Sequence, residues 1–466
     1  MRRAIQLLAV AVLTAGLLAA CSTSDDGSLT GQKSPKAQIG VNVLLDVDVT
    51  PDAIAQLERF GRVNDVLYQI DAVTMRMPAG DLDELRALPI VAAANPDAER
   101  FGGPIDTVSA EDFSDGLSTW NLDVVNVTDF GFDNRQVGYD GAGVYVAVLD
   151  TGLLDTWRQY FPEERIATEY AKSFGGGGGE QGNVSEQPNK WEHDVNSHGT
   201  HVTSTILGYS LDGTPVNGVA PMATIIPVKV LNQNGSGWSS VVARGIEYIG
   251  ELKAGPLVDV PVVINMSLGG PVLDAVEQAA IDFALEQGVI IVASAGNRGT
   301  AGMGYPGAYE PVISVAASGW VGEWYPPAGG VWWYAVNVPE PNDPAYYYIT
   351  DFSSRELTGQ DLDVAAPGSW IVGPYQLQRG KTSYYFLGGT SMASPHVAGI
   401  VALMAQKDGS LTAGDAETYL ESSALALPPG CRDVTQPNGA VEEICWGSDA
   451  TGAGIATADA ALAATP

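Results

Sequence analysis

The chain has 466 residues, of which 45% are hydrophobic and 17% are charged, so it is neither a disordered protein nor a single small domain. Asp and Glu outnumber Lys and Arg by 55 to 23, which gives a formal net charge of −32. A chain with this charge repels phosphate backbones and gains nothing from anionic lipid surfaces, so we expect no nucleic-acid partner. Basic partners are compatible with the charge. Three cysteines are too few for a disulfide scaffold.

The N-terminal segment has the layout of a secretory signal, with a basic start at residues 1–3 and a largely apolar run at 4–20. Small residues then precede Cys21, which resembles the lipobox of bacterial lipoproteins. The resemblance implies that Cys21 carries several acyl chains, which anchor a protein stably where one chain does not. We therefore expect a signal peptide at 1–20, a lipidated tether at 21–37 and export to the cell envelope with a lipid anchor in the membrane. The alternative is an ordinary cleaved signal with an incidental cysteine.

Residues 38–100 predict a small α+β domain. An extended segment over 39–49 is followed by Thr50 and Pro51, a good helix cap and first helical residue. Two further extended pieces, a short helix and a last strand complete the order strand, helix, strand, strand, helix, strand. This order is typical of a ferredoxin-like split βαβ sandwich. The segment contains neither His nor Cys, so we expect no catalytic cluster in it.

From Gly141 onward the pattern changes to buried strands that alternate with amphipathic helices. The apolar runs cover 144–149, 223–230, 258–266, 288–294 and 312–317. This alternation indicates a three-layer α/β domain, in which helices cover both faces of a mostly parallel sheet. Active residues gather at the carboxyl ends of strands in such sheets. Asp150 and Asn297 each follow an apolar run, so their position makes them candidates.

Three short motifs carry an acid, a base and a hydroxyl. Asp150 begins Asp-Thr-Gly, His198 lies in Asn-Ser-His-Gly-Thr-His, and Ser391 lies in Gly-Thr-Ser-Met-Ala-Ser-Pro-His. Their order along the chain, Asp then His then Ser, is that of the subtilisin type of triad. On these motifs residues 117–466 resemble a subtilisin-like serine peptidase (subtilase), and we expect its peptidase domain to cover 101–466. Residues 38–98 resemble the inhibitor-type propeptide of that family more loosely.

The resemblance implies an endopeptidase that works through an acyl-enzyme. A serine hydroxyl is a weak nucleophile near neutral pH, so Ser391 needs His198 as the base that takes its proton. Asp150 holds the other ring nitrogen and stabilises the imidazolium. Asn297 resembles the side-chain donor of the family's oxyanion loop, and the backbone N–H of Ser391 is its partner. No cofactor is expected for catalysis.

The resemblance also implies an extended protein or peptide substrate between two backbone segments. A glycine at 304, at the base of the primary specificity pocket, predicts large apolar residues just before the scissile bond. Arg298, at the pocket rim, predicts that a basic residue is disfavoured there. The two flanking segments are Gly235, Ser236 and Gly237 on one side and Ser267, Leu268 and Gly269 on the other.

Several residues outside this group carry further expectations. In an exported chain Cys431 and Cys445 are expected to form a disulfide, with two buried thiols as the alternative. Many family members bind structural calcium, and Asp212 stands where one such loop would be. Five glycines at 175–179 without a following Lys-Ser/Thr are expected to form a surface loop. The remaining histidines are interpreted as two structural residues, His201 and His396, and an exposed one, His193.

The aromatic insertion at 318–349 predicts a hairpin that packs on the domain's own surface or forms a lip over the cleft. We expect the precursor to be a monomer that cuts itself between Asp97 and Ser118, with its own propeptide as inhibitor. Because Cys21 precedes that cut, maturation is expected to release the enzyme from the membrane. Two other functions remain open: a catalytically silent peptide-binding lipoprotein, and a peptide-cyclising transferase on the same scaffold.

Overall fold

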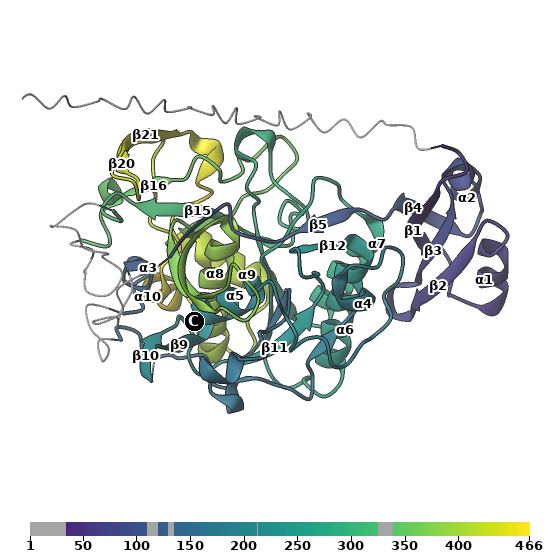
Figure 1. Ribbon diagram of the computed structural model, residues 1–466, viewed down its shortest axis with the longest axis horizontal. Coiled ribbons are helices and arrows are strands. Elements are labelled where there is room, and N and C mark those ends of the chain that lie inside the picture. Colours follow the sequence, from purple (N-terminus) through teal and green to yellow (C-terminus); the bar gives the residue numbers. More distant parts are fainter. Residues whose placement is uncertain (1–33, 110–119, 129–134, 212, 325–337, 339) are drawn as a thin grey trace, which may run out of the picture.

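The computed structural model describes residues 34–109, 120–128, 135–211, 213–324, 338 and 340–466 (Figure 1). They form a small N-terminal domain, drawn in purple, and a larger three-layer domain. None of the helices in these residues is both long and apolar enough to cross a membrane. The predicted calcium ligand Asp212 lies outside the described residues.

The N-terminal domain is a four-stranded antiparallel sheet with two helices on it, as the sequence predicts. The strand order is β2-β3-β1-β4. Thr50 caps the first helix, because its Oγ1 accepts a hydrogen bond from the backbone N–H of Ala53 at 3.2 Å. Val41 and Val43 of β1 and Met75 of β3 are fully buried in its core. The elements are β1 (Gln38–Leu45), α1 (Pro51–Leu57), β2 (Arg62–Leu67), β3 (Ala72–Pro78), α2 (Leu82–Arg86) and β4 (Val91–Pro96).

The larger domain is built on an eight-stranded sheet of order β16-β15-β14-β13-β7-β11-β8, with β17 also paired to β15. The pairings are parallel except for that of β16 with β15. The mostly parallel α/β sheet predicted from the apolar runs is therefore confirmed. The strands are β7 (Tyr145–Asp150), β8 (Lys172–Ser173), β11 (Thr224–Lys229), β13 (Val262–Met266), β14 (Val289–Ser294), β15 (Ile313–Trp320), β16 (Tyr347–Ile349) and β17 (Val364–Pro367).

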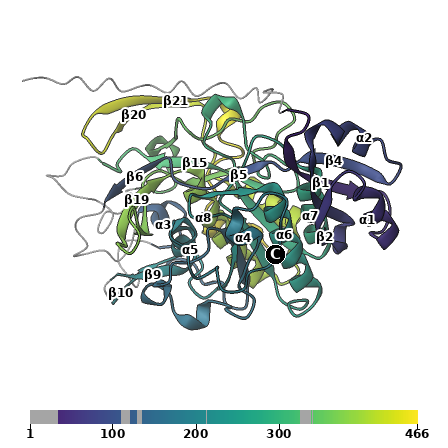
Figure 2. The same ribbon diagram turned by 45° about the vertical axis from the view of Figure 1, so that its right-hand side comes forward.

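Helices cover both faces of this sheet, and successive residues of β7 enter two different cores. Val146 and Val148 pack in the core that contains residues of α5 (His198–Leu207) and α8 (Thr390–Lys407). Ala147 and Leu149 pack in the core of α6 (Ser239–Ala254) and α7 (Ala275–Glu286). Figure 2 shows the N-terminal domain beside α6 and α7. A strand buried on both faces explains its uninterrupted apolar sequence.

Shorter elements surround the layers. α3 (Trp120–Val124), α9 (Ala413–Ser423) and α10 (Ala458–Ala464) are helical, and hairpins or ribbons join the remaining strands. These strands are β5 (Glu99–Phe101) with β12 (Ser236–Trp238), β6 (Asp106–Ser109) with β19 (Ser383–Gly388) and β18 (Ile371–Tyr375), β9 (Gly208–Leu211) with β10 (Thr214–Asn217), and β20 (Gly430–Thr435) with β21 (Val441–Trp446).

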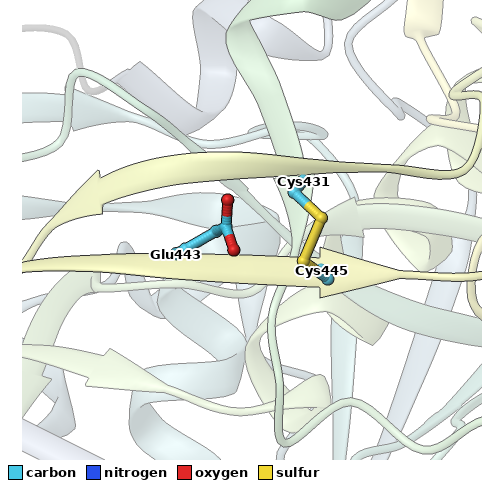
Figure 3. Close-up of side chains that lie close together, drawn as sticks. All are labelled: Cys431, Glu443 and Cys445. Atoms are coloured by element: carbon cyan, nitrogen blue, oxygen red, sulfur yellow. A yellow bond between two sulfur atoms is a disulfide. The ribbon is translucent and has the colours of Figure 1, made fainter.

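The predicted disulfide is present between Cys431 of β20 and Cys445 of β21 (Figure 3). Glu443 lies beside it on β21. Because both sulfur atoms are bonded to each other, neither is a thiolate that could hold a metal together with this carboxylate.

The glycine run is a buried turn, so the expectation of a surface loop is wrong. Gly175–Gly178 form a single turn, α4, in which three of the four glycines are buried. Gly178 has a φ of +93°, and a Cβ there would lie 2.4 Å from the backbone carbon of Leu231. Only glycine has both the freedom of φ and the small size that this packing requires. In the aromatic insertion, β16 pairs with β15, while residues 325–337 of the predicted hairpin lie outside the described residues.

Candidate active site

Asp150 and His198 form a buried pair at the carboxyl end of β7. The two Asp150 carboxylate oxygens lie 2.8 and 2.9 Å from His198 Nδ1, and both side chains have no exposed surface. Asp150 is the last residue of β7 and His198 is the first of α5, so the sheet edge and the helix start bring them together. The pairing leaves Nε2 as the ring nitrogen available to a reacting group, and it has no hydrogen-bond partner among the described residues.

Asp194 holds the turn that precedes His198. Its carboxylate accepts hydrogen bonds from the backbone N–H groups of Asn196 and Ser197 and from the Thr151 hydroxyl, all at 2.8 Å. Burial raises the pKa of Asp194 to about 6, while the nearby Lys229 ammonium acts against this rise. Sequence analysis did not single out Asp194; its position four residues before His198, in a turn-forming segment, is the signal that could have revealed it.

Ser391 lies in the first turn of α8 and is 3% exposed. Its Oγ donates a hydrogen bond to the backbone carbonyl oxygen of Ser267 at 3.1 Å instead of to His198. The Ser267 hydroxyl in turn donates to the backbone carbonyl oxygen of Ser391 at 2.8 Å. The start of an 18-residue helix presents backbone N–H groups and the positive end of the helix dipole to this region.

Asn297 is held in place by hydrogen bonds from Thr390, the first residue of α8. Its Oδ1 accepts hydrogen bonds from the backbone N–H and the hydroxyl of Thr390, both at 2.8 Å. The amide Nδ2 lies 3.6 Å from the position of a Cβ on Gly389, so it faces the backbone just before the helix. The amide nitrogen of Asn297 therefore lies close to the N-terminus of α8.

Residues 99–105 run through this site, and the first three of them form strand β5. The N–H of Phe101 donates to the carbonyl oxygen of Gly269, and the N–H of Gly269 donates back, both at 2.9 Å. The N–H of Gly102 donates to the carbonyl oxygen of Gly235 at 2.8 Å, and that of Ile105 to Gly388 at 2.7 Å.

The centre of this strand lies between the catalytic candidates. A Cβ on Gly102 would lie 2.8 Å from the Ser267 carbonyl oxygen and 3.5 Å from His198 Cε1. On the other side, the Cα of Pro104 lies 3.7 Å from the Cβ position of Gly389. Gly103 therefore lies between a residue beside His198 and a residue beside the start of α8.

The predicted substrate segments both contact this strand. β12, with Ser236 and Gly237, pairs antiparallel with β5, and Gly235 accepts the Gly102 hydrogen bond. Gly269 pairs with Phe101 on the opposite side, after the buried Leu268.

The predicted pocket residues lie next to these segments. Gly304 lies beside Gly269 and Gly270, with 3.5 Å between its Cβ position and the backbone of Gly270. Arg298 is exposed, as expected of a residue at a rim.

The other histidines have structural contacts, as the sequence indicates. His201 Nε2 lies 3.1 Å from the carbonyl oxygen of Ile371, and His396 contacts the Met392 carbonyl oxygen and Asn121. Burial lowers the pKa of His201 to about 3 and that of His396 to about 4, so both are neutral at physiological pH. His193 is exposed.

One acidic cluster has the composition of a site for a hard cation. Carboxylate oxygens of Asp361, Asp363 and Glu417 lie within 4.8 Å of one another. Asp363 is fully buried; its Oδ2 accepts from the Ser314 N–H and hydroxyl, while Oδ1 has no partner among the described residues. Burial raises the pKa of Asp363 to about 8 and that of Glu417 to about 7.

Proteins of known family have sequences similar to that of this chain. The subtilase family (peptidase S8) matches residues 141–447. Subtilisin DY of Bacillus licheniformis is 35% identical over 295 residues, which are 62% of this chain and 86% of that protein. M-protease of Shouchella clausii (strain KSM-K16) is 29% identical over 427 residues, or 89% of this chain and 92% of its own.

A solved structure extends the likeness to the fold. Fervidolysin from Fervidobacterium pennivorans, a keratinolytic enzyme related to subtilisin, superimposes with a TM-score of 0.64 at 25% identity over 92% of this chain. This chain spans 61% of the fervidolysin chain. The match across more than half of the chain, together with the relatives of similar sequence, places the protein in the subtilase family as a subtilisin-like serine endopeptidase.

Proposed function

We propose that Ser391, His198 and Asp150 hydrolyse peptide bonds through an acyl-enzyme. His198 Nε2 takes the Ser391 proton as Oγ bonds to the substrate carbonyl carbon, and returns it to the leaving amine. Water then repeats the sequence, and the C–Oγ bond breaks to regenerate Ser391. The observation that carries this proposal is the buried Asp150–His198 pair directly beside an extended strand that crosses the start of α8.

In this chemistry the Ser391 hydroxyl has to leave its present partner and turn toward His198. In the uncut chain its hydroxyl bonds the Ser267 carbonyl oxygen, and His198 Nε2 has no partner among the described residues. Turning Oγ toward Nε2 exchanges the first hydrogen bond for the catalytic one. Asn297 Nδ2 and the Ser391 N–H then stabilise the negative charge that develops on the substrate oxygen.

A fluorophosphonate probe tests this assignment, because it forms a covalent bond only with an activated serine. The wild-type protein is expected to be labelled on Ser391 and to cleave a protein substrate, and Ser391→Ala is expected to do neither. Absence of both labelling and cleavage would instead support the silent peptide-binding lipoprotein. Ligated rather than hydrolysed products would support the transferase.

We propose self-processing because residues 99–105 of the same chain cross the active site. The contacts of Gly102 beside His198 and of Pro104 beside Gly389 support a cut between Gly103 and Pro104, within the window from Asp97 to Ser118. The expected propeptide, 38–100, would then leave together with residues 101–103, which lie in the cleft. The proline ring restricts this bond, so we expect a slow cut. Mass spectrometry of the mature N-terminus tests the position, and a Ser391→Ala precursor should stay whole.

Location at the cell envelope is proposed from the signal and Cys21. The N-terminal segment that holds them lies outside the described residues. Because Cys21 precedes the cut, maturation releases the enzyme from the membrane unless the propeptide stays bound. Cell fractionation tests this: mature enzyme found only in membranes, free of propeptide, contradicts it. Lipid on Cys21 itself is tested by mass spectrometry of the N-terminal fragment.

Substrate contacts and a structural cation complete the proposal. Residues 235–237 and 267–269 hold the substrate backbone, Gly304 leaves a deep pocket for large apolar residues, and Arg298 disfavours basic ones there. A cleavage profile from a peptide library tests both preferences. Asp361, Asp363 and Glu417 suit calcium, because carboxylate oxygens are its preferred ligands. Loss of thermal stability on chelation is the expected result.

A further inference from the structure

Arg100 is a buried residue at the interface between the N-terminal part of the chain and the larger domain. It is the central residue of β5, and its neighbours Glu99 and Phe101 are exposed whereas Arg100 has no exposed surface. Alternate side chains of a strand point to opposite sides, so one side chain of this strand enters the larger domain. An arginine is rarely buried in this way unless its charge is paired.

The guanidinium group of Arg100 lies in a pocket of the larger domain that contains the Glu277 carboxylate. Nε donates to Oε1 of Glu277 at 3.0 Å, and Nη2 bonds Oε2 of the same carboxylate. Nη2 also donates to the carbonyl oxygen of Val272 at 3.0 Å, and Nη1 to that of Glu99 at 3.0 Å. The two parallel bonds to Glu277 match the planar fork of arginine and not the single ammonium of lysine.

The pocket is part of the larger domain and stays when the propeptide leaves. Glu277 lies in the first turn of α7, where the helix dipole favours a negative charge, and its backbone N–H donates to the capping residue Asp274. Gly270 borders the pocket: a Cβ there would lie 2.8 Å from Arg100 Nη1, so its absence leaves room for the guanidinium. Departure of Arg100 leaves the Glu277 carboxylate without its cation, so the site is open to another guanidinium group.

We infer that Glu277 forms a guanidinium-binding subsite that selects substrates with arginine at the fourth residue before the scissile bond. Counting back from Gly103, Arg100 is that residue. The strand is held by backbone hydrogen bonds to Gly235 and Gly269, so an extended substrate takes the same register. This inference rests on the proposed function. The net charge of −32 adds a long-range attraction for basic peptides.

The test uses the full-length protein after self-processing and fluorogenic peptides that differ only at that fourth position. The three peptides carry arginine, leucine or citrulline, which has the shape of arginine without its charge. We expect kcat/KM for arginine to exceed that for citrulline by roughly 10- to 100-fold. Glu277→Leu should bring the ratio of arginine to leucine close to or below one, and Glu286→Gln, an exposed acid at the other end of α7, should leave it unchanged.

Maturation needs its own control, because Glu277 also binds the propeptide. The double variant Glu277→Leu with Arg100→Leu replaces the ion pair by two apolar residues of similar size. If neither Glu277 variant matures, the citrulline comparison on the wild type still decides. Equal rates for arginine and citrulline, or an arginine preference that survives Glu277→Leu, overturn the inference. An enzyme that takes the fluorophosphonate label and cleaves without preference contradicts only this inference, whereas failure to label or cleave contradicts the proposed function.

Discussion

Two buried pairs of side chains, Asp150–His198 and Arg100–Glu277, have the same exposure but respond differently to the proposed cut. All four side chains have no exposed surface. The first pair lies within the larger domain and remains after the proposed cut at residue 103. The second joins the two sides of that cut and breaks when the propeptide leaves. In the proposed function, chemistry and recognition therefore depend on different buried pairs, one permanent and one exchangeable.

Ser391→Ala is expected to have the largest effect. It removes the nucleophile that is needed both for substrate cleavage and for the cut that separates Arg100 from Glu277. Loss of the nucleophile costs roughly 10⁶-fold in kcat, a magnitude measured on a subtilisin. The variant should accumulate as uncut precursor with Arg100 still bound to Glu277. Rates on a peptide substrate and the mass of the purified chain measure the two consequences. A processed Ser391→Ala chain in a protease-free preparation would contradict the assignment.

Asp150→Asn breaks the permanent pair and leaves the exchangeable one intact. The amide has the shape of the carboxylate but favours the wrong tautomer of His198 and cannot stabilise the imidazolium. A loss of about 10⁴-fold in kcat at neutral pH is therefore expected, as in other triads. Steady-state kinetics check it, with Asp155→Asn, an exposed acid in the same loop, as the control. Equal activity of the two variants would argue against Asp150.

Asn297→Ala removes a donor that acts only on the transition state. We expect kcat to fall by about 10²- to 10³-fold with little change in KM. The Oδ1 of Asn297 also anchors Thr390, so a thermal melt must accompany the kinetics. A rise in KM with unchanged kcat would assign Asn297 to ground-state binding instead.

The two pairs also differ in how far the sequence could predict them. Asp150, His198 and Ser391 lie in contiguous motifs, and the apolar runs around them predict the sheet that brings them together. Arg100 and Glu277 lie in no motif and are 177 positions apart. A glutamate on an amphipathic helix is ordinarily solvated, and only the docking of two domains buries this one.

The glycine turn at 175–178 shows the same limit of sequence reasoning. Composition suggested solvent exposure, whereas the tertiary fold places the backbone of Leu231 against it. Local patterns thus predict elements and motifs, but not contacts between segments far apart in the chain.

The smallest expected effect concerns Asp274, beside the exchangeable pair. Its carboxylate accepts hydrogen bonds from Asn42 of the N-terminal domain at 2.8 Å and from Ser239 at 2.9 Å. The charged groups nearby are Arg100, Glu277 and Asp97. Burial raises its pKa to about 6 from an ordinary value of 3.8. A carboxyl group with a raised pKa stabilises the folded precursor at low pH, and this stabilisation is lost as the pH rises from about 4 to 6.

Asp274→Asn in the Ser391→Ala background isolates this contribution. The substitution keeps a good helix cap and removes the titration. The stability of the precursor that retains Asp274, relative to the chain with Asp274→Asn, should therefore fall by at most about 3 kcal/mol between pH 4 and pH 7. Denaturant unfolding of both uncut chains measures it. A difference independent of pH would show that Asp274 is ionised throughout and that its contact with Asn42 does not respond to pH.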